Sequence, residues 1–166
     1  MKSTLKLSGH YKVEHWRGDK LLKTYEGKNL IVNEGINFIL DLLGNNVALT
    51  EWYVGLVQDD TTEAIDANTT GADIGTDFTE FTDYTGNRQL WLATGDVAAS
   101  KSLVNSAVVT FPMTGSGTIW GIFIVDAATG AGSGVTMWAG TAFSTAAVVV
   151  NGDNLKVTYT VNGADA

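Results

Sequence analysis

The side chains best suited to bind an ion lie in an acidic stretch, DDTTEAIDANTTGADIGTD, at positions 59–77. Four oxygen-bearing residues have the one, three, five and twelve spacing of a calcium loop, with Gly71 at the sixth position: Asp66, Asn68, Thr70 and Asp77. Alternating oxygen ligands around a glycine turn suit a hard cation. However, the last ligand is an aspartate instead of a longer glutamate, and no flanking helices are evident. We therefore expect a long acidic surface loop without a cofactor, and keep calcium as the alternative.

Residues for catalysis are scarce. The chain has no cysteine, which excludes thiol nucleophiles, disulfides and thiolate metal sites. Its two histidines, His10 and His15, are five residues apart on an expected strand, so they point to opposite faces and cannot readily share a metal. The glycine–serine stretches at 115–117 and 132–134 lack the lysine of a phosphate-binding loop. We expect a protein that is not an enzyme.

Five tryptophans, at positions 16, 52, 91, 120 and 138, offer a different chemistry. Exposed together, they could form a platform that stacks on sugars, which would make this chain a carbohydrate-binding module. Tryptophans of this kind are more often part of a core or a subunit contact. Both interpretations remain open at the level of sequence.

Charge is divided unevenly along the chain. The net charge is −8, but the first 28 residues carry +4 and the remainder −12. An acidic protein is a poor partner for nucleic acid, and no stretch of about 18 apolar residues is present to span a membrane. The basic segment at 1–28 is either a solvated hairpin or an arm that docks on an acidic neighbour, such as another copy. Its interface candidates are Lys6, Lys12 and Arg17.

The elements that must position these residues are mostly strands. Many glycines, threonines and valines with one proline favour short strands joined by turns. Gly18-Asp19 predicts one hairpin turn, with Glu14 opposite Lys23 and Val13 opposite Thr24. Asn151-Gly152 predicts a second hairpin near the end of the chain. We expect a single domain, 1–166, that folds as an all-β, antiparallel, jelly-roll-like β-sandwich.

The segment GTIWGIFIV is apolar on both of its faces. A sandwich strand with one face in water would be polar on that face, so a helix, a long loop or another subunit must cover it. We expect subunit contacts there and at two further tryptophan-bearing strands; the apolar interface candidates are Trp120, Ile122, Ile124, Trp52 and Trp91.

One short α-helix is expected at about residues 33–43, within NLIVNEGINFILDLLG. Asn33 can cap its start, Glu34 suits its positive end, and Gly44 suits the position just past its end. Its apolar stripe consists of Ile36, Ile39, Leu40 and Leu43. We expect the helix to bury this stripe as a plug over an open end or face of the sandwich.

The order of these signals resembles a family of small structural proteins of tailed bacteriophages. The resemblance runs from GKNLIVNEGINFILDLL through EWYVGLV, FTEFTDYTGNRQLW and GTIWGIFIV to VVVNGDNLKVTYTV. Some proteins that this chain resembles are capsid cement or decoration proteins, which are jelly-roll homo-oligomers on the outside of the shell. The family has no catalytic motif to transfer.

The resemblance implies a capsid decoration subunit on the exterior of the virion, made in the host bacterial cytoplasm. Its implied partners are the major capsid protein and copies of itself, as a homodimer or homotrimer. A tail or head-fibre component of the virion is the alternative in the same class. A carbohydrate-binding module is the alternative from another class.

Overall fold

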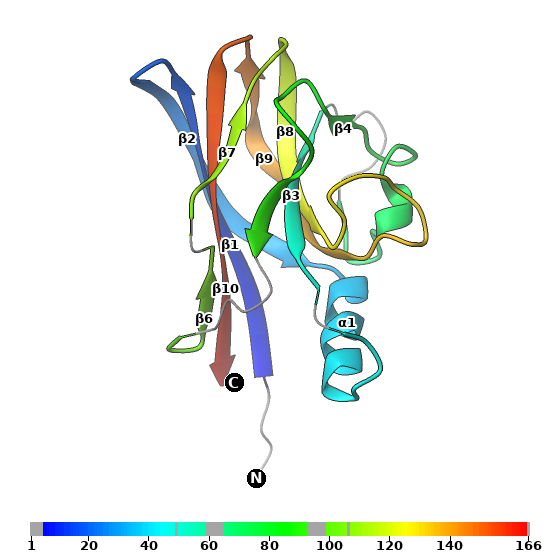
Figure 1. Ribbon diagram of the computed structural model, residues 1–166. Coiled ribbons are helices and arrows are strands. Elements are labelled where there is room, and N and C mark those ends of the chain that lie inside the picture. Colours follow the sequence, from blue (N-terminus) through cyan, green and yellow to red (C-terminus); the bar gives the residue numbers. More distant parts are fainter. Residues whose placement is uncertain (1–4, 49, 59–64, 93–98, 106, 166) are drawn as a thin grey trace.

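A computed structural model describes residues 5–48, 50–58, 65–92, 99–105 and 107–165 (Figure 1). Within these ranges the helical elements are α1 (Asn33–Leu43) and a short 3-10 turn, η1 (Gly71–Asp73). The strands are β1 (Leu5–Arg17), β2 (Lys20–Ile31), β3 (Trp52–Val57), β4 (Glu80–Phe81), β5 (Gln89–Leu92), β6 (Ser102–Val104), β7 (Val109–Pro112), β8 (Gly117–Val125), β9 (Met137–Val149) and β10 (Asp153–Asp165).

The strands form one curled antiparallel sheet in the order β4-β3-β8-β9-β2-β1-β10-β6, with β5 on β3 and β7 on β10. Strand β2 joins the two halves, because most of it pairs with β1 while Leu30 and Ile31 pair with β9. We call β1, β2, β6, β7 and β10 sheet A, and β3, β4, β5, β8 and β9 sheet B; they face each other in Figure 1. The predicted antiparallel sandwich with one short helix is confirmed.

The main core lies between the two sheets. Strand β10 alternates as predicted, with Leu155, Val157, Tyr159 and Val161 buried and the intervening residues half-exposed. The indole N–H of Trp91 on β5 donates to the backbone oxygen of Tyr159 at 3.0 Å. This bond connects sheet B to sheet A through the core, and it satisfies a polar group that would otherwise be costly to bury.

Loops of the same chain cover the outer face of β8. Phe123 and Val125 are fully buried there against Ile74, Phe78 and Val135, which lie in the segments 65–78 and 126–136. The ring of Phe78 meets that of Phe123 at a centroid distance of 5.3 Å. The expectation that the second face of this strand is covered is therefore correct, and the cover consists of two loops.

Helix α1 begins and ends where the sequence predicts, but it packs with another face. Gly35 is its one fully buried residue, and a Cβ there would lie 2.4 Å from the backbone oxygen of Trp138 on β9. Only glycine permits this approach, which directs Phe38 edge-on against Trp52 at a ring-centroid distance of 5.0 Å. Ile39 packs against the core beside Phe38.

The expected burial of the whole helical stripe is wrong. Ile39 is partly buried, but Ile36, Leu40 and Leu43 are 43%, 60% and 80% exposed. The reason is that the helix is apolar over more than one face, and the close contact at Gly35 selects the face that meets the sheet. The helix therefore borders the open end of the sandwich without plugging it (Figure 1).

Both ends of the helix differ in detail from the prediction. Val32 precedes the first turn without a side-chain cap, and the Asn33 amide donates instead to the Asn68 Oδ1 at 3.1 Å. Gly44 follows the helix as expected but has a right-handed backbone, and Asn45 takes the left-handed conformation with φ 57°. The capping role predicted for Asn33 is therefore wrong.

The first hairpin turns at Gly18-Asp19 as predicted, with φ 55° at Gly18. Its register is shifted by one residue from the prediction: Glu14 lies opposite Thr24 and His15 opposite Lys23. A bulge opposite His15 and Trp16 causes the shift, because it adds one residue, Leu22, to β2, which a two-residue turn between regular strands does not anticipate.

The second turn is also where the sequence places it, but it does not close a hairpin. Gly152 has φ 89°, as the predicted turn requires. The strands on either side belong to different sheets, because β9 pairs with β8 and β2 while β10 pairs with β1, β6 and β7. The chain thus crosses from sheet B to sheet A at Asn151-Gly152, and we call this turn the corner.

The loop cover generates a first prediction. A Cβ on Gly71 would lie 1.9 Å from the backbone oxygen of Val135, so Gly71→Ala must push the two covering loops apart. We expect a loss of about 1–3 kcal/mol in the free energy of unfolding, the usual cost of overpacking, measured by urea denaturation. Gly134→Ala is the matched control, because nothing lies within 4 Å of its Cβ position. Equal stability of the two variants would contradict the tight contact.

Candidate interaction surfaces

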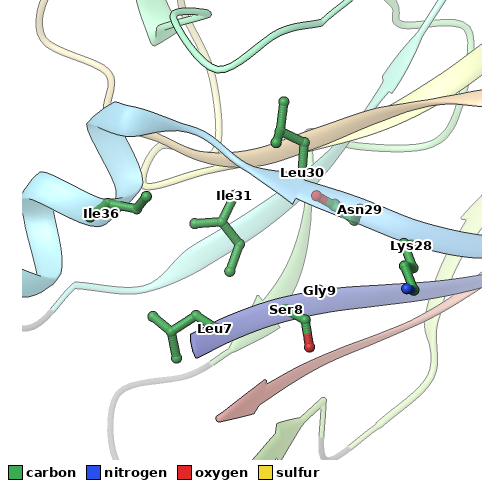
Figure 2. Close-up of a pocket in the computed structure, with 8 residues that line it drawn as sticks. All are labelled: Leu7, Ser8, Gly9, Lys28, Asn29, Leu30, Ile31 and Ile36. Carbon is green, nitrogen blue, oxygen red and sulfur yellow. The ribbon is translucent and has the colours of Figure 1, made fainter. Parts of the chain in front are cut away.

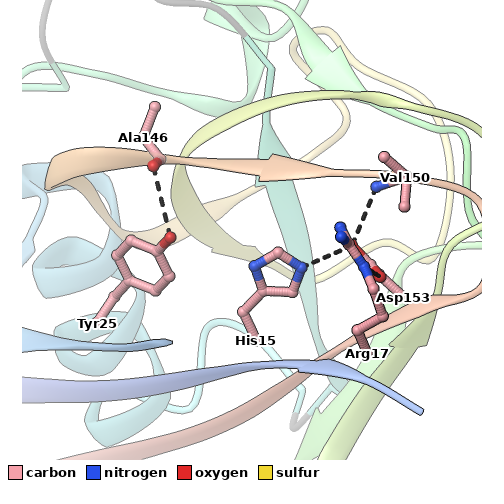
Figure 3. A network of polar contacts seen from close by, with 6 residues as sticks. All are labelled: His15, Arg17, Tyr25, Ala146, Val150 and Asp153. Carbon is pink, nitrogen blue, oxygen red and sulfur yellow. Dashed lines mark hydrogen bonds and ion pairs between the residues drawn. The ribbon is translucent and has the colours of Figure 1, made fainter. Parts of the chain in front are cut away.

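A buried carboxylate holds the corner to the end of β1 (Figure 3). Asp153 is fully buried and accepts hydrogen bonds from Arg17 Nε at 2.7 Å and Arg17 Nη2 at 2.9 Å. It also lies 2.7 Å from His15 Nε2 and accepts from the backbone N–H of Val150 at 3.1 Å. The first hairpin, the corner and the start of β10 are thus joined at a single side chain.

The electrostatics of this cluster favour the ionised form of Asp153. The hydrogen bonds from Arg17 hold the pKa of the Asp153 carboxyl well below its ordinary value, against the opposing effect of burial, with further help from His15 and Val150. His15, for which the sequence showed no partner, therefore belongs to a structural network. Arg17 is engaged with Asp153 although half of its side chain remains exposed.

A second buried ion pair fastens the loop cover of sheet B. Arg88, with 2% of its side chain exposed, forms a bidentate pair with Glu80 at 2.8 and 2.7 Å. Its guanidinium also donates to the backbone oxygens of Ala127 and Gly130 and lies 5.1 Å from the ring centroid of Phe123. Arg88 thus connects β4, the 126–136 loop and the outer face of β8.

The residues with calcium-loop spacing have structural hydrogen bonds. Asp66 Oδ1 accepts from the backbone N–H groups of Asn68 and Thr69, and Thr70 forms a capping box with Asp73 around η1. Within the described ranges, no three His, Asp or Glu side chains gather as metal ligands. Residues 65–77 of the expected surface loop form part of the cover over β8, and residues 59–64 lie outside the described part. Calcium binding remains an untested prediction.

The apolar interface candidates lie mostly inside the chain. Ile122 and Ile124 are fully buried in the main core, and Trp52 and Trp91 are buried with them. These four side chains offer no surface to a neighbouring subunit, so their prediction as contact residues is corrected: the two sheets and the helix cover them. Trp120 is 37% exposed on β8 and remains available.

The tryptophans do not form a shared platform. Trp52, Trp91 and Trp138 are buried, and Trp16 is half-buried beneath the Lys156 ammonium, which lies 4.7 Å from its ring centroid. Trp120 stands as a single exposed ring, which is less than the stacked surface that the sugar-binding alternative needs.

The outer face of sheet A carries the basic residues of the first hairpin. Lys6, Lys12 and Lys28 are exposed there, and Lys12 pairs with Glu14 on the same strand at 2.5 Å. Lys6 and Lys12 are therefore placed where a docking role needs them. The structure makes this segment a full part of the sheet, because all thirteen residues of β1 pair with β10.

A groove of about 290 Å³ opens between the first hairpin and α1, lined chiefly by Leu7, Leu30, Ile31 and Ile36 (Figure 2). Figure 2 shows Leu7, Ile31 and Ile36 approaching the same space from β1, β2 and α1. Asn29 also lines the groove; it is buried, and neither polar atom of its amide has a hydrogen-bond partner in the described chain. Burying such an unpaired amide costs about 1–3 kcal/mol of folding stability. The groove therefore contains a buried polar group whose hydrogen bonds the described chain does not satisfy.

Sequence reasoning missed Asp153, Arg88 and Asn29. A signal existed for Arg88, since it is one of only three basic residues after position 28, and a lone arginine in an acidic body has acidic partners within reach. A signal existed for His15 as well, because it shares the inward face of β1 with Tyr11 and Val13. Asp153 follows a turn dipeptide and looked like ordinary turn chemistry.

Comparison with known protein families identifies the family of this chain. The model of the family described as Podophage GP4 fiber I protein gp80 matches residues 33–161, which is well over half of the sequence. The chain belongs to this family. It is therefore a bacteriophage virion structural protein, as the resemblance implied. The search of curated proteins found no match to this chain.

The matched part of this phage protein begins at the first residue of α1 and extends into β10, so it includes the helix, the loop cover and the corner. Strands β1 and β2 precede it. Helix α1, with eleven residues the longest helix in the described part of the chain, falls short of the roughly 20 residues that a membrane-spanning helix needs.

The corner network predicts a strong effect of Asp153→Asn. Loss of the buried carboxylate removes the ion pair that joins three elements, so we expect the free energy of unfolding to fall by about 3 kcal/mol. This is the lower end for a broken buried pair, because half-exposed Arg17 can be rehydrated. Denaturant unfolding measures the loss, and Asp19→Asn in the exposed turn nearby is the control. Similar stability of both variants would contradict the role of the network.

The same carboxylate predicts a dependence on pH. The pKa of Asp153 is lower in the folded chain than its ordinary value of 3.8, so its contribution is complete above about pH 4. The contribution is lost as pH falls from there towards the folded pKa. The difference in unfolding free energy between the wild type and Asp153→Asn should therefore be constant near neutral pH and shrink in acid. A difference that grows on acidification would refute this assignment.

Proposed function

We propose that this protein is a subunit of a fibre on the virion of a podophage. The observation that supports this assignment is the family match over residues 33–161. The matching family is described as a podophage fibre protein. The order expected from sequence, with capsid decoration first and a fibre component second, is thereby reversed. Capsid cement remains the second candidate, because a compact sandwich can serve on a shell as well as on a fibre.

The subunit acts by binding and not by catalysis, in our proposal. Its buried polar clusters each join separate structural elements: Asp153 holds the corner, and Arg88 holds the loop cover. The exposed features are those of a docking protein, with a basic outer face on sheet A, one exposed tryptophan and an apolar helix face. We further propose that copies of the chain contact each other and a neighbouring virion protein.

Location on the particle tests the proposal. Antibodies raised against the purified protein, labelled with gold, should bind to fibres on intact virions in electron micrographs. Particles that lack the protein provide the control and should show no label. Label distributed over the shell, together with reduced resistance of the deficient particles to heat or low salt, would replace the fibre role with the cement role. Label on neither structure would refute both.

A further inference from the structure

The groove lies where two paired strands separate. Strand β1 pairs with β2 as far as Gly9, which lies opposite Asn29. Beyond this pair, β1 continues through residues 5–8 along β10, while β2 turns away to pair Leu30 and Ile31 with β9. Figure 2 shows the two ribbons diverging from this point, with the groove between them. Within the described ranges, the edge of residues 5–8 on the groove side therefore has no strand partner.

An unpaired strand edge presents backbone groups that another extended chain can pair with. In an antiparallel pair, every second residue directs its N–H and C=O away from the partner strand. Residues 5–8 pair with β10 on one side, so their outward backbone groups are directed towards the groove. The chemical complement of such an edge is another extended backbone, which supplies donors and acceptors at the same spacing.

The groove also provides contacts for the side chains of an added strand. Leu7 packs partly against the main core, and Ile31 is buried in it, so both lie on the inner side of the groove. Leu30 and Ile36 line its outer side and are 40% and 43% exposed. Successive residues of a strand point to opposite faces, so an aliphatic residue opposite Leu7 enters the groove. Asn29 adds a buried amide that lacks a partner in the described chain, and a peptide group matches its donors and acceptor.

Charge beside the edge selects the polar residues of the partner. Lys6 is exposed on the outer face of this edge, and residues 5–8 contain no acid. A residue directly opposite Lys6 in an added strand lies on the same face, where an opposite charge stabilises the pair. A second copy that presented the same edge would instead place Lys6 of both copies on one face without an acid between them. The edge therefore favours a different protein.

We propose that the groove accepts an extended segment of a neighbouring virion protein, which adds to β1 along residues 5–8 as an extra strand. The segment alternates aliphatic residues, which enter the groove beside Leu7, with acidic residues, which face Lys6. Main-chain hydrogen bonds provide the affinity, and the alternating side chains provide the specificity. This inference rests on the proposed virion role for the source of the segment, but binding to the groove is measured on the purified chain.

A short synthetic peptide that alternates valine and aspartate is the probe, added at millimolar concentration to the isotope-labelled full chain. We expect the backbone amide NMR signals of residues 5–8 to shift and their hydrogen exchange to slow, because the added strand pairs with this edge. Signals around Val148, on the outer face of sheet B, should not change. The same peptide with N-methylated backbone amides is the matched control; it keeps the side chains but lacks the backbone donors, so it should not bind.

Charge reversal at Lys6 tests the polarity of the partner. Lys6→Glu places an acid opposite the aspartates of the probe, so we expect binding to weaken about fivefold relative to the wild type. Lys20→Glu, at the turn end of β2, makes the same change in net charge and should bind the probe as the wild type does. Both lysines are exposed, so the melting temperatures of the two variants should equal that of the wild type.

Absence of shifts at residues 5–8 overturns the inference, and so does equal binding of the N-methylated peptide. Binding to Lys6→Glu that is no weaker than binding to Lys20→Glu overturns it as well. Each of these results leaves the fibre role untouched, because that role is decided by the gold label on virions. Conversely, label on neither fibre nor shell refutes the virion role, while a positive peptide result still establishes the strand-accepting groove.

Discussion

Burial of β8 on both faces is the constraint on which the rest of the structure depends. The strand has fully buried side chains towards the main core and towards the loop cover, so neither face can be left to water. The segments 65–78 and 126–136 provide the second layer, and Arg88 fastens the second of them to β4 with a buried ion pair and two backbone hydrogen bonds. Because the loops cover this face of β8, the helix is not needed to cover it. The apolar face of α1 is left over as a consequence.

The position of the helix follows from two small features. Gly35 allows α1 to lie against the backbone of Trp138, and Glu34 accepts hydrogen bonds from the backbone N–H groups of Gly71 at 3.0 Å and Met137 at 2.6 Å. One carboxylate thus ties the helix start both to the loop cover and to β9. Glu34 is favourable at the helix start, as expected, but the donors of these two hydrogen bonds belong to the loop cover and β9. A helix-dipole argument alone does not identify these donors.

The sequence predicted the local elements well and their partners less well. The helix bounds, both turn dipeptides and the alternation of β10 were readable, because each depends on residues close together in the chain. The one-residue bulge in β2 opposite His15 was not readable, because a turn dipeptide does not reveal an extra residue within a strand. The separation of β9 from β10 was not readable either, because it depends on which distant strands pair with each of them. Periodicity also could not choose between two apolar faces of α1. Gly35 determines which face meets the sheet, because its lack of a side chain allows the close approach to β9.

The candidate surfaces show the same division. Buried tryptophans looked like contact residues because aromatic strands serve cores and interfaces alike, and only the three-dimensional cover distinguishes the two uses. The calcium-loop spacing of the acidic loop also has a structural use, because Asp, Asn and Thr at alternating positions build turns, as Asp66 and Thr70 do here. The basic residues were placed correctly on a surface, since charge favours exposure whatever the fold.

A helix of three turns gives a small contact, well below the roughly 1,200–2,000 Å² of a standard interface. Such a contact is sufficient where a particle already holds the subunits side by side, because the second encounter is then intramolecular in effect. Ile36, Leu40 and Leu43 are exposed in the folded chain, so the fold does not depend on their burial. An uncovered helix face beside a fully enclosed core therefore fits a subunit whose fold is complete without that face.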